Sequence, residues 1–279
     1  MSKRTDHYSL TFTGRRINNE DSLLALKFAD DIFFFAVADG MGGNQSGELA
    51  SNLVLSTAKN ILDEEIPHIN SSKDLKEILE RIYLLSQNEI IKAIDNDPTL
   101  KGMGTTLVIL FIYKGVYVWG NIGDSRLYSI RSEKTEKLTV DHTHVQEFIN
   151  NSNAPLPKSV IDKYGTFLSK VLDGGNDTPD IYPFDKDYEQ LKDDTIFLLC
   201  SDGLIDNKAS SSYEYLTNYL LGIKDLKESA EQLIAYAYTM GSKDNITAVL
   251  FEYGKVKRRK SVYKKNPYPP SIHQLMNNK

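Results

Sequence analysis

The sequence is poor in cysteine and has no long apolar run, and both absences narrow its class. Its 279 residues include one cysteine, Cys200, so an internal disulfide framework and a cysteine zinc cage are excluded. No apolar segment approaches the roughly 20 residues that cross a bilayer. Residues 1–16 also lack the apolar core of a signal peptide. We therefore expect a cytoplasmic protein without a membrane span.

The chain also lacks a strong excess of either charge. The formal net charge is -5, which gives no general attraction to nucleic acid or to membrane surfaces. With 41% hydrophobic and 25% charged residues, the composition is that of a globular protein. Residues 254–279 differ, because they are basic and then rich in proline and asparagine. We expect a disordered tail there, with docking to an acidic partner as the alternative.

Hydrophobic periodicity predicts an α+β fold. The expected elements, in chain order, are strands at 8–12, 22–28 and 33–38, helices beginning near Ser46 and Ser72, a meander of three or four antiparallel strands within 104–140, a strand before Asp202, helices at 213–221 and 226–240, and a last strand. A hairpin turn is expected at Lys114-Gly115. Residues 142–194 predict a surface excursion with one short helix at 144–150. This order indicates sheets packed between helix pairs.

Acidic residues stand at the ends of the predicted strands. Asp39 ends the run FFFAVA and precedes a string of glycines, so it is either a turn residue or a working carboxylate. Asp202 in CSDG ends another apolar strand, and Asp244 in KDN opens the last one. Glu20-Asp21 stand together in NNED.

Neighbouring strand ends bring such carboxylates close together, where they repel strongly unless cations bind between them. Oxygen ligands without a histidine or cysteine cluster select Mg²⁺ or Mn²⁺ over zinc. Two such ions activate a water molecule and neutralise a phosphoryl group under attack. The carboxylates therefore favour hydrolysis of a phosphate ester as the reaction class.

Seven motifs carry a resemblance to a known family. GRRINNED, VADGMGG, GTT, NIGDSRLY, LTVDHT, LLCSDGLID and DNITAVLF occur in this order between residues 8 and 253. Together they resemble the signature of the metal-dependent serine/threonine protein phosphatases of type 2C, the PPM family. Met41 after Asp39-Gly40, in place of a histidine, is similar to the compact bacterial branch.

The resemblance implies a fold and an activity. The fold is a four-layer α-β-β-α sandwich with two antiparallel sheets flanked by helix pairs, and residues 1–253 form its catalytic domain. The implied activity is hydrolysis of phosphoserine and phosphothreonine esters in phosphorylated proteins, opposing a cognate Ser/Thr kinase. The attack comes from a hydroxide that bridges two metal ions, without a covalent phosphoenzyme. The basic tail is a candidate docking segment.

The resemblance also implies that the acidic motif residues hold the two ions. The expected ligands are Glu20, Asp39 and the Gly40 carbonyl for one ion, and Asp39, Asp202 and Asp244 for the other. Asp21 would orient a metal-bound water, and Arg16 would grip the substrate phosphate through two parallel hydrogen bonds. Asp124 is similar to the ligand of a third ion. Its alternative is a carboxylate that caps the turn and pairs with Arg126.

Three other features of the sequence are not expected to form a separate functional site. The glycines of GMGGNQSG lack the spacing and the Lys-Ser/Thr pair of a P-loop. His142 and His144 are not spaced as a helical zinc pair and are expected to support their loop. Cys200 has no arginine at the distance that a cysteine phosphatase loop needs, which predicts a core position.

The substrate is the least specified part of the prediction. Bacterial relatives commonly carry a His-Pro pair and a basic helix in a flap, which here corresponds to residues 142–194. This chain has no His-Pro there, and TFLSKVL is only a loose helical counterpart.

Two other functions stay open. A catalytically inactive pseudophosphatase would act as a binding module and predicts missing ligands. A two-metal hydrolase of small phosphate esters or nucleic acid is disfavoured for nucleic acid by the acidic average.

Overall fold

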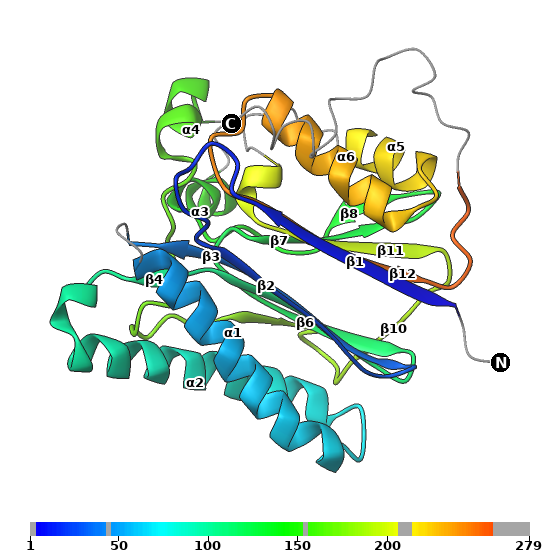
Figure 1. Cartoon of the computed structure of the whole chain (residues 1–279), viewed down its shortest axis with the longest axis horizontal. Helices are drawn as coiled ribbons and strands as arrows, with labels where there is room; N and C mark the ends of the chain where they lie inside the picture. Colours follow the sequence, from blue (N-terminus) through cyan, green and yellow to red (C-terminus); the bar gives the residue numbers. More distant parts are fainter. Residues whose placement is uncertain (1–3, 43–45, 153–155, 206–213, 259–279) are drawn as a thin grey trace.

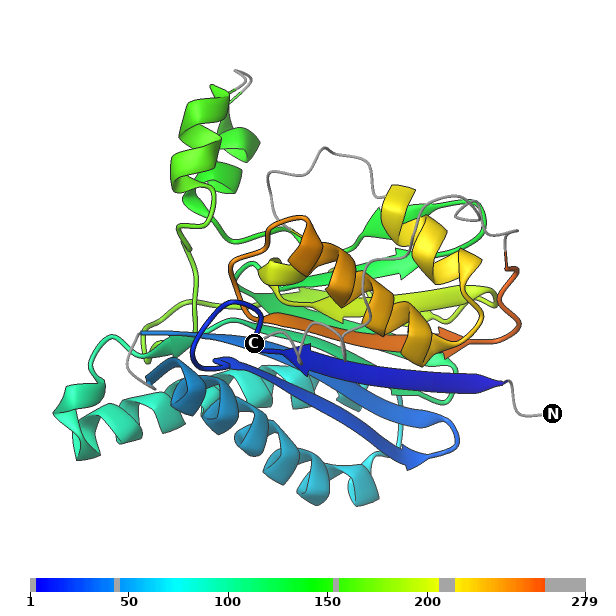
Figure 2. The ribbon, with the colours of Figure 1, turned by 45° about the horizontal axis from the view of Figure 1, so that its top comes forward.

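Two antiparallel sheets lie face to face, and helices cover the outer face of each (Figures 1 and 2). The computed structural model describes residues 4–42, 46–152, 156–205 and 214–258. In spatial order, the first sheet contains β1 (Thr5–Phe12), β12 (Ile246–Tyr253), β11 (Thr195–Cys200), β7 (Arg126–Ile130) and β8 (Thr135–Lys137). The second contains β10 (Glu189–Gln190), β6 (Val116–Ile122), β5 (Leu107–Tyr113), β3 (Ile32–Met41) and β2 (Asp21–Ala29), with β4 (Gly104–Thr105) on β3 and β9 (Asp180–Tyr182) on β6.

Two long helices cover the second sheet and two shorter ones cover the first. The pairs are α1 (Ser46–Glu65) with α2 (Asp74–Asn96), and α5 (Glu214–Gly222) with α6 (Leu226–Thr239). Short 3-10 turns stand at η1 (Ile66–His68), η2 (Pro98–Leu100) and η3 (Asp202–Leu204). Two further helices, α3 (His144–Asn151) and α4 (Lys158–Tyr164), stand away from the layers (Figure 2). The predicted α-β-β-α sandwich is therefore confirmed. None of the helices in the described ranges has the length and apolar character to cross a membrane.

The apolar run in β3 supplies two cores at once. Phe33 and Phe35 point between the two sheets, while Phe34 and Ala36 point toward α1 and α2. Side chains alternate across a strand, so a strand buried on both faces must be apolar at every position. β3 pairs with β2 on one side and β5 on the other. The predicted central strand is therefore confirmed.

The interpretation of Asp39 as a turn residue is wrong. β3 continues through Asp39 to Met41, where Gly40 pairs with Thr105 and Met41 with Gly104 of β4. The second partner strand satisfies the backbone beyond the point where the apolar run ends. Asp39 is therefore held on a strand, which fixes its side chain more firmly than a turn would.

The predicted meander is divided between the two sheets. Its first hairpin forms as expected, with Lys114 and Gly115 both in the left-handed region at φ +49° and +84°. After β6 the chain turns at Gly123, whose φ is +96°, and β7 and β8 join the other sheet. The expectation of one continuous meander is wrong because strand composition does not specify which sheet a strand enters.

Residues 142–194 contain more structure than predicted. Besides the expected helix near 144–150, they form α4 and the short strands β9 and β10. TFLSKVL is not helical, because Leu168 bridges to Thr143 and the buried Leu172 bridges to Thr105. Strands of two or three residues are too short to show periodicity in a sequence.

Residues 254–258, the first of the predicted tail, have defined contacts. Lys257 donates its backbone N–H to Asp194, and Arg258 forms an ion pair with Glu252, so residues 254–258 pack on the first sheet. The expectation of disorder is wrong for these residues. Residues 259–279 lie outside the described part of the chain, and their predicted disorder stays a prediction, as do the domain limits.

Replacing Phe35 by alanine should test the inter-sheet core. Phe35 is fully buried and contacts Phe251 of the opposite sheet at a ring-centroid distance of 5.3 Å. We expect Phe35→Ala to lower the free energy of unfolding by about 3–5 kcal/mol in urea titrations. Phe148→Ala, at a position on α3 that is 47% exposed, is the control and should change it by less than about 0.5 kcal/mol. Equal effects of the two changes would contradict this core.

Candidate active site

A cavity of about 670 Å³ opens at one end of the sandwich. The β1–β2 loop, the end of β3, the β6–β7 turn, η3 and the segment before β12 meet there. Seven of the predicted site residues line this cavity: Arg16, Glu20, Asp39, Gly40, Asp124, Asp202 and Asp244. The eighth, Asp21, lies buried opposite Asp39 in the β2–β3 ladder. Segments far apart in the chain therefore bring all predicted site residues together.

The backbone of Asp39 is held by two threonines of the GTT motif. The N–H of Asp39 donates to Oγ1 of Thr106 at 3.0 Å, and Oγ1 of Thr105 donates to the Asp39 carbonyl at 3.0 Å. Thr106 also shares a 2.7 Å hydroxyl contact with Ser125, the neighbour of Asp124. These residues carry no charge, so no role beyond their motif was predicted for them from the sequence.

Gly40 permits a close approach that no side chain allows. Its N–H donates to the Glu20 carbonyl at 3.1 Å. A Cβ at this position would lie 2.1 Å from the carbonyl oxygen of Gly47, at the start of α1, and 2.8 Å from that of Glu20. Any other residue would push α1 or the β1–β2 loop away from the cavity.

Asp21 is oriented from behind by two hydroxyl groups. Its Oδ2 accepts hydrogen bonds from Ser201 and Thr247, both at 2.7 Å. Its Oδ1 is buried and has no hydrogen-bond partner among the described residues. Burial raises the pKa of Asp21 to about 7, and the charges of Asp202 and Asp244 add to the rise against these two hydrogen bonds.

The cavity carboxylates disfavour one another's ionised forms. Burial raises the pKa of Asp39 well above its ordinary value, and the neighbouring charges of Asp21 and Asp202 raise it further. Burial, followed by the charge of Asp202, does the same for Asp124. Several negative charges in one partly desolvated cavity require a counter-charge.

Arg16 provides part of that counter-charge. Its Nη2 donates to Oδ2 of Asp244 at 2.7 Å, and both side chains are partly exposed, at 52% and 36%. Burial alone would lower the pKa of Arg16, but Asp244, Glu20 and Asp39 outweigh it and raise the pKa. Arg16 therefore stays charged at the cavity mouth.

Asn245 holds the loop that carries Arg16. Its Nδ2 donates to the carbonyls of Thr13 and Asn18, both at 2.9 Å, and its Oδ1 accepts from the N–H of Glu20 at 2.8 Å. The Asn245 side chain thus fixes the loop of residues 13–20 beside Asp244. This role was not predicted from the sequence, although the position of Asn245 directly after a candidate ligand was a usable signal.

The donor chemistry of the cavity fits divalent cations. The groups that line it offer carboxylate and carbonyl oxygens, and no histidine or cysteine of the described chain lies among them, which is the preference of Mg²⁺ and Mn²⁺. The raised pKa values and the unpartnered Oδ1 of Asp21 indicate missing positive charge. Within the described residues, no three of these acids already stand as a metal-binding cluster. They surround a wide cavity instead, with Asp244 engaged by Arg16.

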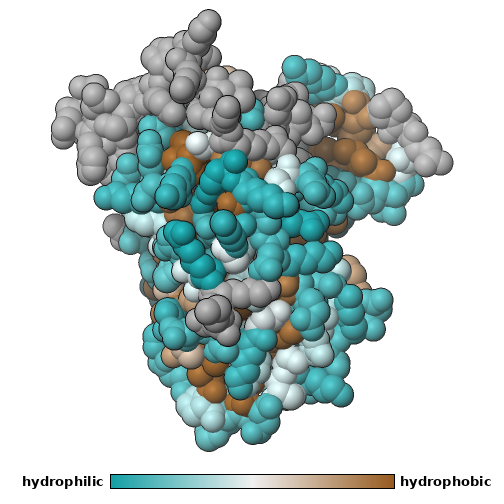
Figure 3. All heavy atoms as spheres, turned by 90° about the vertical axis from the view of Figure 1, so that its right-hand side faces the viewer, coloured by the Kyte–Doolittle hydropathy of each residue, from teal (hydrophilic) through white to brown (hydrophobic). Residues whose placement is uncertain are grey.

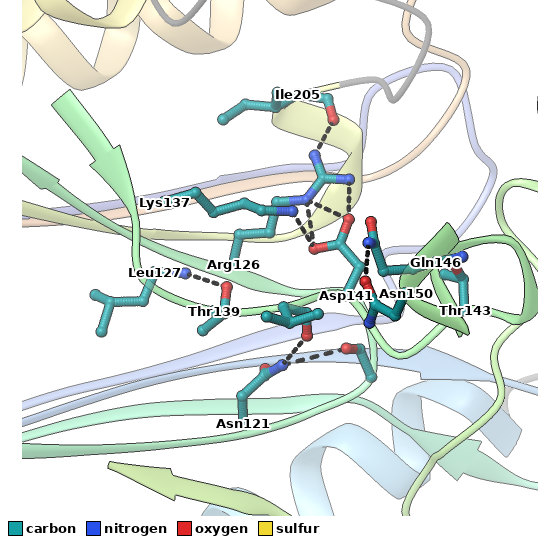
Figure 4. Close-up of polar contacts among 12 residues, drawn as sticks. Asn121, Arg126, Leu127, Lys137, Thr139, Asp141, Thr143, Gln146, Asn150 and Ile205 are labelled. Carbon is teal, nitrogen blue, oxygen red and sulfur yellow. Dashed lines mark hydrogen bonds and ion pairs between the residues drawn. The ribbon is translucent and has the colours of Figure 1, made fainter. Parts of the chain in front are cut away.

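A buried ion pair ties the cavity to the base of α3 (Figure 4). Arg126 donates to Asp141 through Nε at 3.1 Å and Nη2 at 2.8 Å, and through Nη1 to the carbonyl of Ile205, which follows η3. Lys137 adds a 2.9 Å contact to Asp141. The main ion pair of Arg126 is therefore with Asp141. Asp124 lines the cavity, and its two interpretations stay predictions.

His142 and Cys200 occupy supporting positions. Nδ1 of His142 accepts the N–H of Gly123 at 3.2 Å, and Nε2 lies 3.2 Å from Asp180, so the predicted support of its loop is confirmed. Cys200 is fully buried in β11, and burial raises the pKa of its thiol to about 12. Its predicted place in the core is confirmed.

Comparison with known proteins gives a consistent result. A family model described as Protein phosphatase 2C matches residues 13–236. The serine/threonine phosphatase stp of Listeria welshimeri is 29% identical over 244 residues, covering 85% of this chain and 91% of that protein. PstP of Mycobacterium tuberculosis is 29% identical over 245 residues, covering 86% of this chain but only 44% of that protein. This chain thus spans less than half of the mycobacterial protein.

A solved structure shows the same architecture. The catalytic domain of the serine/threonine protein phosphatase PstP, in complex with two manganese ions, superposes with a TM-score of 0.75 at 29% identity. The superposition covers 90% of this chain and 99% of that one. The layers, and not only the motifs, are therefore similar.

The ion pair in Figure 4 predicts a pH-dependent loss of stability. Burial would raise the pKa of Asp141, but Arg126 and Lys137 outweigh it and lower the pKa. Such a group stabilises the fold above its unfolded pKa of about 4, and this contribution is lost as the pH falls through the folded value. Asp141→Asn leaves a buried guanidinium uncompensated and should cost about 3–5 kcal/mol at neutral pH.

Urea unfolding of both proteins at several pH values checks this. The difference between wild type and Asp141→Asn should narrow below about pH 4. Asp30→Asn, at an exposed pair with Lys27, is the control and should change stability little at any pH. A difference that stays constant down to low pH would contradict the charged pair.

Proposed function

Because the chain belongs to the protein phosphatase 2C family, we propose that it hydrolyses phosphoserine and phosphothreonine esters of proteins in its acidic cavity. The observation that carries this proposal is the pairing of an oxygen-only acidic cavity with one arginine at its mouth. Carboxylates alone would repel a phosphate, so they serve a phosphatase only when cations lie between them and the substrate. The Listeria welshimeri relative, which this chain matches over 91% of its length, is named a serine/threonine phosphatase, and this supports the same substrate class.

The cations proposed are two Mn²⁺ or Mg²⁺ ions, as in the manganese complex of PstP. Glu20, Asp39 and the Gly40 carbonyl would hold one ion, and Asp39, Asp202 and Asp244 the other; Asp124 is the proposed ligand of a third. When bound, the ions supply a water molecule of lowered pKa and neutralise charge on the phosphoryl group. Asp39 suits the shared position because its backbone is fixed on both sides by Thr105 and Thr106.

Arg16 is proposed to bind the substrate phosphate. Its guanidinium is partly exposed, stays charged, and is mounted on a loop that Asn245 holds in place. In the structure it donates to Asp244, so phosphate binding requires an exchange of one anionic partner for another. The fork of N–H donors in arginine matches a phosphate as well as a carboxylate.

Asp21 is proposed to hold a water molecule and its proton beside the reacting atoms. Ser201 and Thr247 occupy one carboxylate oxygen and leave Oδ1 available. This oxygen would accept a hydrogen bond from that water molecule and so orient it.

The substrates follow from this activity. We infer that they are proteins phosphorylated by a Ser/Thr kinase, and that the chain opposes that kinase. The alternative of an inactive binding module predicts lost ligands, whereas every predicted ligand lines the cavity. Docking through the basic tail and the cytoplasmic location stay predictions.

Asp39→Asn provides the main test of this function. We expect release of phosphate from a phosphothreonine peptide to require Mn²⁺, to stop with EDTA, and to fall at least about 100-fold in Asp39→Asn. Without metal the variant should be more stable than the wild type in thermal unfolding, because one of the repelling charges is removed. Mn²⁺ should raise the melting temperature of the wild type more than that of the variant. A wild type that binds Mn²⁺ but releases no phosphate would overturn the proposal.

Arg16→Ala should separate substrate binding from metal binding. We expect KM for the phosphopeptide to rise about 10- to 100-fold, because a charge-assisted contact to the phosphate is lost. Mn²⁺ affinity, measured by calorimetry, should be unchanged or higher, because Asp244 loses its competing partner. Arg81→Ala, at a surface ion pair on α2, is the control. Weaker Mn²⁺ binding with unchanged KM would contradict this role.

A further inference from the structure

A second cavity lies between the two sheets, away from the acidic one. It measures about 350 Å³ and is lined by residues of β6, β9 and β10 on one side and of β7, β8 and β11 on the other. Figure 3 views the molecule from the right-hand side of Figure 1, and a notch indents the surface between its upper and lower halves. We call this cavity the inter-sheet groove.

The inter-sheet groove lies where both sheets end. β8, with three residues, and β10, with two, are the last strands of their sheets, and residues of both line the groove. An edge strand leaves backbone N–H and C=O groups unpaired on its outer side. Such edges bind extended peptide segments by adding a strand. The groove is therefore flanked by two short edges that accept an extended chain.

Aromatic rings form the walls of the groove. Trp119 stacks on Tyr182 at 5.2 Å with an interplanar angle of 10°, and Phe184 meets Tyr182 edge-on at 5.7 Å. Tyr117 contacts Phe197 of the opposite sheet at 5.2 Å. Phe184 is 69% exposed, so its ring is accessible to a ligand in the groove. The walls thus favour an aromatic or large apolar side chain.

The acidic and basic side chains that line the groove differ in whether they have ion-pair partners. Glu136 pairs with Lys134 at 3.0 Å, and Glu189 pairs with Lys186 at 2.6 Å, so both acids are already neutralised.

Lys137 is likewise engaged, by Asp141 at 2.9 Å. Arg131 and Lys192 also line the groove, and neither has an ion-pair partner in the described part of the chain. The groove therefore has two cations, Arg131 and Lys192, without an ion-pair partner in the described residues, whereas both of its acids have one.

We propose that the inter-sheet groove docks an extended acidic segment that carries an aromatic side chain, supplied by the phosphoprotein substrate. The acidic residues meet Arg131 and Lys192, and the aromatic residue enters beside Phe184 and Tyr182. That the partner is the substrate rests on the proposed function; the binding itself does not. Docking apart from the reacting phosphate raises the local concentration of substrate without changing the chemistry.

The single tryptophan of the chain makes this binding directly observable. Trp119 is the only one in the sequence, and it lines the groove. We would titrate the full chain, without metal, with the peptide acetyl-EDFDEF-amide and follow the emission of Trp119. Saturable change is expected with this peptide and not with acetyl-QNFNQF-amide, which lacks the charges, or with acetyl-EDADEA-amide, which lacks the rings. Equal binding of the uncharged peptide would overturn the charge assignment and the proposal.

Charge reversal in the groove should weaken this binding. The double change Arg131→Glu and Lys192→Glu should raise the dissociation constant roughly tenfold or more. Phe184→Ala should also weaken binding, with little effect on folding because the ring is exposed. Lys224→Glu, an exposed lysine between α5 and α6 on the outer layer, is the matched control and should leave binding unchanged. Unchanged binding in both groove variants would contradict the proposed site.

Kinetics then connect the groove to the substrate. A phosphothreonine peptide extended by EDFDEF should show a lower KM than the bare peptide in the wild type, and the same KM as the bare peptide in the charge-reversed variant. The kcat should not differ. Peptide binding by a wild type that releases no phosphate with Mn²⁺ present would leave the groove intact and fault only the proposed function. Trp119 emission that changes with protein concentration alone, together with dimers in sedimentation, would assign the groove to a second copy of this chain and overturn the proposal.

Discussion

Mutual repulsion among carboxylates at one end of the sandwich is the constraint on which the rest of the structure depends. Asp21 and Asp39 belong to one sheet, while Asp202 and Asp244 stand next to strands of the other. The packing of the sheets against each other, through rings such as Phe35 and Phe251, brings these two sets together. The burial of apolar side chains therefore supplies the free energy that holds like charges close. The site is stabilised by the core behind it and not by its own contacts.

Two kinds of aspartate show how the fold separates structure from function. Asp141 is surrounded by Arg126 and Lys137, and its pKa is lowered. Asp21 is held by two hydroxyls and Asp39 by two threonines at its backbone, and the pKa of both is raised. Hydroxyl partners fix the position of a carboxylate without supplying a counter-charge, so the carboxylate can still bind a cation. Cationic partners already supply that counter-charge. The uncharged residues of the motifs are thus as necessary to the site as the acids.

Sequence patterns predicted the layers and the gathering of the acids, because both follow from short-range rules. β3 is buried on both faces and therefore reads as an unbroken apolar run that ends in Asp39. The transfer of the chain to the second sheet at Gly123, the bridge of Leu172 to Thr105, and the three contacts of Asn245 depend on long-range packing. No periodicity records such contacts. The inter-sheet groove was missed for the same reason, since its walls come from six separate strands.

The burial of Cys200 has a consequence for the behaviour of the protein under oxidative conditions. Peroxide attacks the thiolate form of cysteine, and oxidation needs solvent access. The only thiol of this chain is fully buried in β11, with a pKa raised to about 12, so at cellular pH it is neither ionised nor reachable. Phosphatases that use a cysteine nucleophile lose activity when that sulfur is oxidised. This fold places its one thiol where peroxide does not reach, so thiol oxidation is not a route by which the protein is inactivated.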